Sequence, residues 1–212
     1  MAVPGFPVYI FDVDGTLMDS AADICGTLRV VLAAEGYAGD LSDDYLRSFI
    51  GRHLIDFFEA IGFPQEKFDS MVAHYRAVYY QRGHTSTSVY PGVAEMLAGL
   101  GGRKSTATTK GSESVRAILD QFGLLPHFHH VQGTDGFPAK PEPDVILASI
   151  AGLGARAEDC LFIGDSPQDM EAGRRAGVRT CAVRWGYGDA EQMARWQPDF
   201  WIDSPADLLK LR

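Results

Sequence analysis

Short apolar segments that alternate with helix-like segments constrain the fold of this chain more than any other feature. Strand-like segments occur at 8–11, 103–109, 129–132, 160–163, 178–183 and 200–202. Helix-like segments, in which apolar residues recur at helical spacing, occur at 91–100, 115–122, 143–153, 168–176, 190–196 and from 205 onward. Strands that alternate with helices are typical of a parallel sheet with helices on both faces. The pattern therefore predicts an α/β fold.

One helical block interrupts this alternation directly after the first strand. From residue 20 to about residue 82 the pattern is helical throughout, with apolar stripes along 24–32 and 68–79. We interpret the block as an insertion into the sheet domain, with crossings near 17–20 and 83–90. The expected organisation is a core of residues 1–18 and 85–212 and an α-helical cap of residues 19–84.

Polar residues gather at the predicted carboxyl ends of the strands, which is where open parallel sheets bind ligands. The four groups are Asp12-Val-Asp14-Gly15-Thr16, Thr108-Thr109-Lys110, Lys140-Pro141 and Gly164-Asp165-Ser166-Pro167-Gln168-Asp169. Two like charges about 4 Å apart repel by roughly 4 kcal/mol at an effective dielectric constant near 20. Four aspartates at one edge therefore need a cation or raised pKa values. Mg²⁺ suits a site with oxygen ligands that also binds phosphate.

The motifs resemble those of the haloacid dehalogenase superfamily of hydrolases. DVDGTLMDS, the Thr108 strand end, Lys140-Pro141 and GDSPQDM occur in the order of that superfamily's four motifs and span nearly the whole chain. The helical block resembles its α-helical cap. Trp185-Gly-Tyr-Gly and the segment 198–208 resemble the phosphoglycolate-phosphatase-like branch. The resemblance implies a Rossmann-like parallel sheet core with an inserted α-helical cap.

The resemblance also implies a role for each acidic motif residue. Asp12 is the implied nucleophile and forms an aspartyl-phosphate. Asp14 is the implied general acid, which protonates the leaving oxygen and then accepts a proton from the attacking water. The implied ligands of Mg²⁺ are Asp12, the backbone carbonyl of Asp14, and Asp165. Asp169 either binds the ion directly or holds the residues that bind it.

The phosphoryl group is implied to lie against four further positions. Thr108 and Lys140 would hold its oxygens, and Gly15 would allow the backbone to approach closely and present N–H donors. Thr109 stands where the superfamily often has Asn, and it is counted here with the phosphate-binding residues. The segment 103–107 is more polar than a buried central strand is expected to be.

Gly51-Arg52-His53 lies in a break between predicted helices of the cap, in a region that helps select the substrate in the superfamily. Arg52 suits a second anionic group because its guanidinium forms bidentate contacts. The alternative is an ordinary surface arginine. His53 is a weaker candidate for the same role, because a lone histidine often only packs or caps a helix. Phosphoglycolate is the first substrate to test, because Arg52 could meet its carboxylate.

The composition argues against some classes of binding partner. The chain has 28 acidic and 19 basic residues and a formal charge of −9, which argues against binding to nucleic-acid backbones or anionic membranes. Cys25, Cys160 and Cys181 are far apart and odd in number, as expected for reduced thiols in a cytoplasmic protein. We expect a small phosphorylated metabolite as partner, and a monomer or a homodimer.

The expected function is an Mg²⁺-dependent phosphatase that hydrolyses a small phosphomonoester through an aspartyl-phosphate. A sugar phosphomutase of the same superfamily would use the same residues and remains open. A phospho-receiver signalling module is an alternative of another class, since it also places Asp, Thr and Lys on a parallel sheet. Receivers lack the helical cap and the Asp12-x-Asp14 pair, which favours the phosphatase.

Overall fold

The computed structural model describes residues 3–210, and its main sheet is parallel throughout. The five strands lie in the order β4-β1-β5-β6-β7. Their bounds are β1 Val8–Phe11, β4 Arg103–Thr106, β5 Cys160–Gly164, β6 Arg179–Val183 and β7 Phe200–Ile202. The predicted α/β fold with a Rossmann-like parallel sheet is therefore confirmed.

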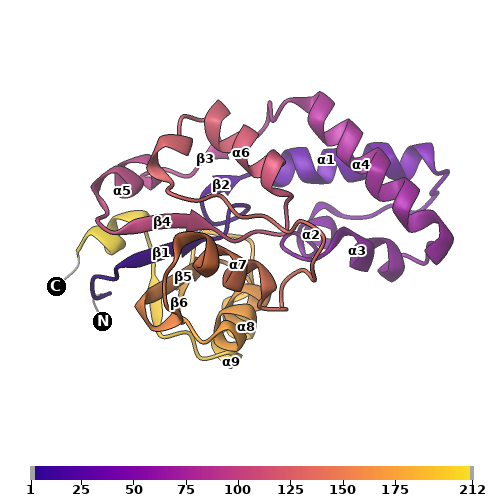
Figure 1. Cartoon of the computed structure of the whole chain (residues 1–212). Helices are drawn as coiled ribbons and strands as arrows, with labels where there is room; N and C mark the ends of the chain where they lie inside the picture. The colour runs from indigo at the N-terminus through magenta and orange to yellow at the C-terminus, as the bar shows by residue number, and fades with distance from the viewer. Residues whose placement is uncertain (1–2, 211–212) are drawn as a thin grey trace.

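Helices cover both faces of this sheet (Figure 1). Their bounds are α5 Val93–Gly99, α6 Ser112–Gln121, α7 Asp144–Leu153, α8 Pro167–Ala176 and α9 Ala190–Arg195. Four short 3-10 helices complete the described chain: η1 Gln65–Lys67, η2 Leu125–His127, η3 Ala157–Asp159 and η4 Pro205–Leu209. No helix within residues 3–210 has the length and apolarity needed to cross a membrane.

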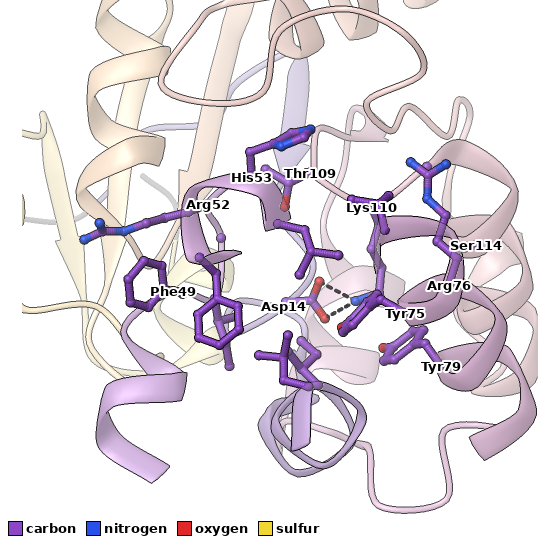
Figure 2. Close-up of a pocket in the computed structure, with 18 of the residues that line it drawn as sticks. Asp14, Phe49, Arg52, His53, Tyr75, Arg76, Tyr79, Thr109, Lys110 and Ser114 are labelled. Atoms are coloured by element: carbon purple, nitrogen blue, oxygen red, sulfur yellow. Dashed lines mark hydrogen bonds and ion pairs between the residues drawn. The ribbon is translucent and has the colours of Figure 1, made fainter. Parts of the chain in front are cut away.

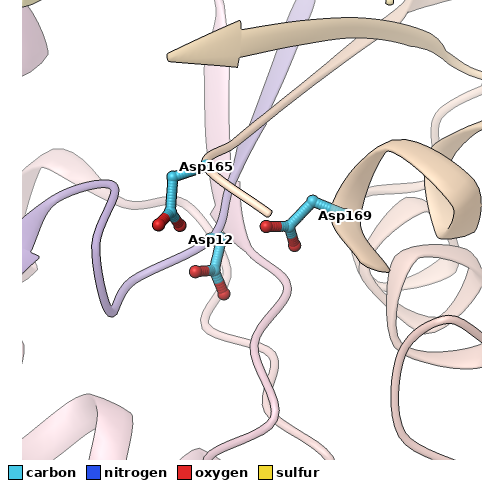
Figure 3. Close-up of side chains that lie close together, drawn as sticks. All are labelled: Asp12, Asp165 and Asp169. Atoms are coloured by element: carbon cyan, nitrogen blue, oxygen red, sulfur yellow. The ribbon is translucent and has the colours of Figure 1, made fainter. Parts of the chain in front are cut away.

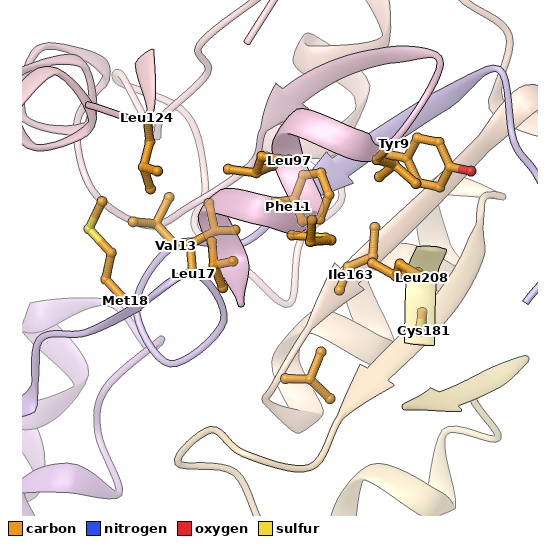
Figure 4. Close-up of a cluster of buried hydrophobic side chains, with 14 of the residues drawn as sticks. Tyr9, Phe11, Val13, Leu17, Met18, Leu97, Leu124, Ile163, Cys181 and Leu208 are labelled. Carbon is orange, nitrogen blue, oxygen red and sulfur yellow. The ribbon is translucent and has the colours of Figure 1, made fainter. Parts of the chain in front are cut away.

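The apolar run of β1 packs against helices on two sides. Tyr9 and Phe11 belong to the buried cluster that includes α5 and α6 (Figure 4), whereas Val8 and Ile10 belong to the cluster that includes α7 and α8. Successive side chains of a strand point to opposite faces of the sheet. A strand that is covered on both faces therefore needs an unbroken apolar sequence, and β1 has one.

The strand β4 lies at the edge of the sheet and pairs only with β1 among the strands described. The segment 103–107 is polar although residues 104–107 are buried, and its hydroxyl groups have partners. Ser105 Oγ accepts from Ser149 Oγ at 2.7 Å, and Thr106 Oγ1 donates to the Gln132 carbonyl oxygen at 2.9 Å. The predicted strand at 129–132 is wrong, since those residues form no strand. The backbone there still contacts β4: His129 and His130 donate to the Lys104 carbonyl oxygen (2.8 and 3.3 Å), and the Gln132 N–H donates to Thr106 Oγ1 at 2.9 Å.

The helical block lies beyond the carboxyl ends of the strands (Figure 1). It contains α1 Ala21–Ala34, α2 Asp43–Arg47, α3 Leu54–Ala60 and α4 Phe68–Arg82. These helices share an apolar cluster of their own, separate from the clusters on the sheet. The block is flanked by two short strands, β2 Met18–Asp19 and β3 Ser88–Val89, which pair in antiparallel fashion. The chain thus enters and leaves the block at one place.

Candidate active site

Three buried carboxylates meet at the carboxyl edge of the sheet (Figure 3). Asp12 follows β1, Asp165 follows β5, and Asp169 lies in the first turn of α8. The parallel pairing of Phe11 with Ile163 brings the first two strand ends to the same level. One carboxylate oxygen of each aspartate lies within 4.8 Å of the other two. All three side chains belong to residues that are at most 2% exposed.

A single buried ammonium contacts this cluster. The Nζ atom of Lys140 donates to Asp12 Oδ1 at 2.7 Å, to Asp169 Oδ1 at 2.5 Å and to the Ala107 carbonyl at 3.2 Å. Burial raises the pKa of Asp12 to about 7, although the attraction of Lys140 acts in the opposite direction. Burial, together with repulsion from Asp169, also raises the pKa of Asp165 well above its ordinary value. Without a further cation, the cluster thus favours the neutral form of two of its three carboxyl groups.

The donor set fits a hard divalent cation. The available ligands are carboxylate oxygens, which Mg²⁺ prefers, and the three carboxylates share one ammonium, that of Lys140. The two oxygens of Asp169 already have partners, because Oδ1 accepts from Lys140 and Oδ2 accepts from Ser166 N at 3.0 Å and Ser166 Oγ at 2.6 Å. The Ser166 N–H contact, together with the Asp169 N–H that donates to Ser166 Oγ at 3.2 Å, forms the capping box of α8 and fixes the carboxylate at the edge of the cluster.

Asp165 is held by two segments that are distant in sequence. Its Oδ1 accepts from Thr16 Oγ1 at 3.1 Å, and its Oδ2 accepts from the backbone N–H of Tyr187 at 2.8 Å. Gly15 adopts a φ of +88°, and a Cβ atom there would collide with the Asp165 carboxylate. A Cβ at Gly186 would also collide with Asp165. The sequence analysis assigned no role to this loop, although the motif Trp185-Gly-Tyr-Gly contained the signal.

Tyr187 also connects the acidic cluster to the start of the helical block. Its hydroxyl donates to Asp19 Oδ1 at 2.8 Å and accepts from the backbone N–H of Ser20 at 2.7 Å and of Ala21 at 3.0 Å. Tyr187 thus holds the Asp165 carboxylate through its backbone and the entry to the block through its side chain. 

Asp14 does not join the acidic cluster but faces the helical block (Figure 2). Its two oxygens accept from Lys110 Nζ at 2.8 and 2.7 Å, and Ser20 Oγ also donates to Oδ1. The Lys110 ammonium lies 4.7 Å from the centroid of the Tyr79 ring. Burial lowers the pKa of Lys110, but the Asp14 charge outweighs this effect and the pKa lies above its ordinary value. The sequence analysis assigned no role to Lys110, which directly follows the Thr108-Thr109 motif.

The remaining phosphate candidates lie in the loop after β4. Thr108 is 1% exposed and directly follows Ala107, whose carbonyl oxygen accepts from Lys140. Its neighbour Thr109 lies on the wall of a cavity between this loop and the helical block. The loop therefore connects the acidic cluster on one side with the cavity on the other.

The cavity has a volume of about 150 Å³ and is lined by residues of both parts of the chain. Arg52 and His53 lie on its wall. The Arg52 side chain is exposed, with its guanidinium 5.2 Å from the Phe49 ring centroid, and it points away from Asp14 in Figure 2. His53 accepts at Nδ1 from the backbone N–H of Ile55 at 3.2 Å and caps α3. Neither residue contacts Asp14 in this conformation.

Comparisons with known proteins agree with this arrangement. The sequence model of the haloacid dehalogenase-like hydrolases matches residues 9–183. A phosphoglycolate phosphatase of Aquifex aeolicus is 33% identical over 209 residues, which cover 96% of this chain and 95% of that protein. A tyrosine-protein kinase of Mycobacterium tuberculosis is 34% identical over 187 residues, which cover 86% of this chain but 63% of that longer protein.

A solved structure extends the similarity to the whole fold. The crystal structure of a predicted phosphatase from Clostridium acetobutylicum superimposes with a TM-score of 0.89 at 26% identity, over 97% of both chains. The chain therefore belongs to the haloacid dehalogenase-like hydrolase family, as a phosphatase that has phosphoglycolate phosphatases among its relatives.

Proposed function

We propose that the protein hydrolyses a small phosphomonoester that carries a second acidic group, with phosphoglycolate as the first candidate. One observation carries the proposal: the Asp12 carboxylate is held by Lys140 at a buried cluster, while Asp14, two residues later, faces a small cavity. This arrangement supports Asp12 as the nucleophile and Asp14 as the group that transfers protons, both directly after β1. The printed function of the Aquifex aeolicus relative supports the choice of substrate.

Asp12 is the proposed nucleophile. Lys140 binds its Oδ1 at 2.7 Å, which leaves Oδ2 as the oxygen that attacks phosphorus. The new bond joins Oδ2 to phosphorus, the bond from phosphorus to the ester oxygen breaks, and the electron pair leaves with that oxygen. Asp14 supplies a proton to the leaving oxygen and accepts one from the water that later hydrolyses the aspartyl-phosphate.

The phosphoryl oxygens are proposed to lie between the loops after β1 and β4. Lys140 provides an ammonium that stays charged, because the neighbouring carboxylates raise its pKa above the ordinary value even though burial lowers it. Thr108 and Thr109 follow the carbonyl that holds this ammonium. Gly15 lacks the Cβ atom that would collide with the Asp165 carboxylate, so its backbone can lie close to the proposed phosphoryl site.

Mg²⁺ is the proposed cofactor, held by Asp12, Asp165 and the Asp14 backbone carbonyl, with Asp169 bonded to Lys140 beside them. When bound, the ion would offset the excess negative charge of the cluster and that of the phosphoryl group. The protein's own part is to hold the ligands: Thr16 and Tyr187 orient Asp165, and Ser166 orients Asp169.

Residues 19–84 are proposed to form a cap that closes over the substrate and excludes water. The block has its own apolar cluster, and its two chain crossings to the sheet domain lie together at the β2–β3 pair, which fits a unit that moves as a body. Arg52 and His53 are proposed to contact the substrate from the cap. The three cysteines are free and buried, which is compatible with a cytoplasmic location.

The decisive experiment measures phosphate release from a panel of phosphomonoesters with and without Mg²⁺. We expect release from phosphoglycolate that requires the ion and that is lost in Asp12→Asn, because an amide oxygen is a poor nucleophile. Undiminished release by Asp12→Asn would exclude the proposed mechanism. Conversion of a sugar phosphate into its isomer, without release of phosphate, would indicate the mutase instead.

A further inference from the structure

We propose that Lys110 binds a carboxylate of the substrate, and that this change of partner releases Asp14 for its role at the leaving oxygen. The inference rests on the proposed phosphatase function and names the residue that selects its substrate. Lys110 lies in the loop after β4, on the core side of the cavity, and is distinct from the cap residues Arg52 and His53.

The present contacts of Asp14 do not suit its proposed role. Its carboxylate accepts three hydrogen bonds, two from Lys110 and one from Ser20, so both of its oxygens are already engaged. A group that donates a proton to the leaving oxygen has to turn toward that oxygen and give up its ion pair. The pairing with Lys110 therefore describes a resting arrangement, and something has to replace Asp14 there.

If Asp14 turned away, the Lys110 ammonium would lose its counter-charge. Its side chain is 13% exposed and its ammonium lies over the Tyr79 ring, in a cavity whose other walls are largely apolar and aromatic. An unpaired ammonium in such surroundings is strongly disfavoured, because it loses water and gains no counter-charge. An anion that enters the cavity can take over the contact, whereas a neutral substituent cannot.

The chemistry of the present occupant indicates which anion fits. Asp14 is a carboxylate, and the lysine bonds to both of its oxygens (Figure 2). A substrate carboxylate would replace it with the same geometry. The cavity volume of about 150 Å³ is below the roughly 300 Å³ at which pockets for drug-sized ligands begin. The structure thus favours phosphomonoesters whose leaving group is a small carboxylic acid.

The test compares two esters of equal chain length, phosphoglycolate and ethyl phosphate, which differ in the carboxylate. We expect the wild-type protein to show a higher kcat/KM for phosphoglycolate. In Lys110→Met this preference should fall about ten- to a hundredfold, the change that one hydrogen bond to a charged group accounts for. Lys110→Arg keeps the charge and should retain part of the preference.

Two controls separate selection from general damage. Lys67→Met removes a cap lysine that pairs with Glu35 outside the site, and it should leave the preference unchanged. Arg52→Ala tests the cap arginine as the carboxylate ligand. The inference is overturned if Lys110→Met keeps the wild-type preference, even when it slows both esters. It is also overturned if Arg52→Ala alone removes that preference. A wild-type protein that prefers ethyl phosphate would overturn it without any variant. Absence of phosphate release from both esters would instead overturn the proposed function.

Discussion

The imbalance between three buried carboxylates and one buried ammonium shapes the site at the scale of single residues. Each carboxylate is held by specific donors, which restrict its movement: Lys140 holds Asp12, Thr16 and Tyr187 hold Asp165, and Ser166 holds Asp169. Side chains that are fixed in this way hold their oxygens in one arrangement. The absence of a side chain at Gly15 is also needed for this arrangement, because a methyl group there would occupy the space of the Asp165 carboxylate.

Gly15→Ala tests this close approach. Alanine would have to adopt a φ of +88° and would collide with Asp165, so we expect the free energy of unfolding to fall by about 1–3 kcal/mol and phosphatase activity to be lost. Urea unfolding and phosphate release measure the two effects. Gly101→Ala is the matched control, because a Cβ atom there meets nothing within 4 Å. Equal stability of both variants would contradict the assigned role of Gly15.

At the scale of secondary-structure elements, two short strands and a buried aspartate connect the helical block to the sheet domain. The chain crosses twice, through β2 and β3, and α1 is tied to the second crossing by Asp23. This aspartate is fully buried and accepts from the backbone N–H of Ser86 at 2.9 Å and from Thr87 Oγ1 at 2.8 Å, with Arg82 Nε 3.4 Å away. The contacts set where the block begins and ends relative to the site.

Asp23→Asn should weaken this connection. The Asn side chain carries no charge to attract Arg82, and only one of its two terminal atoms can accept a hydrogen bond. We therefore expect the free energy of unfolding to fall by about 1.5–3 kcal/mol. Asp120→Asn, at an exposed position of α6, should change it by less than about 0.5 kcal/mol. Chemical denaturation of the two variants provides the comparison. A stability loss at Asp23 no larger than at Asp120 would show that the buried contacts do not secure the block.

At the scale of the whole molecule, the stability of the folded protein depends on pH and on bound metal. The net charge of −9 is adverse to an anionic substrate at long range, but part of it is concentrated in the acidic cluster. Because the pKa of Asp12 is raised to about 7, the folded protein without metal binds more protons than the unfolded chain between about pH 4 and pH 7. Its stability should therefore decrease as the pH rises through that window, and the loss is complete above about pH 7.

Mg²⁺ should stabilise the folded protein more at about pH 8 than at about pH 5. Metal binding requires deprotonated carboxylates, so the ion competes with protons at the lower pH and with none at the higher pH. Thermal unfolding with and without the ion, followed at both pH values, measures the difference in Tm. Asp165→Asn should reduce the gain at the higher pH. A gain that is independent of pH, or that survives in Asp165→Asn, would contradict a metal site at this cluster.

The sequence by itself determined the local structure and the chemical inventory. The apolar run of β1, the helical stripes of the inserted block and the aspartates at the strand ends are set by residue type and spacing along the chain, which are visible without a fold. The prediction of a strand at 129–132 was wrong: the Gln132 backbone bonds to the Thr106 side chain in place of the β4 backbone. Local patterns do not show which strand lies at an edge.

Only the tertiary structure decided how the polar groups pair. Asp14 and Lys110 are 96 residues apart, and Asp165 meets the backbone of Tyr187 across 22 residues. These contacts depend on how the loop after β4 and the loop after β6 pack against the first strand end, and no periodicity in the sequence encodes that packing. The sequence therefore determined which groups are available for phosphoryl chemistry. The tertiary structure decided that one aspartate faces the cavity with a lysine while three others form the acidic cluster.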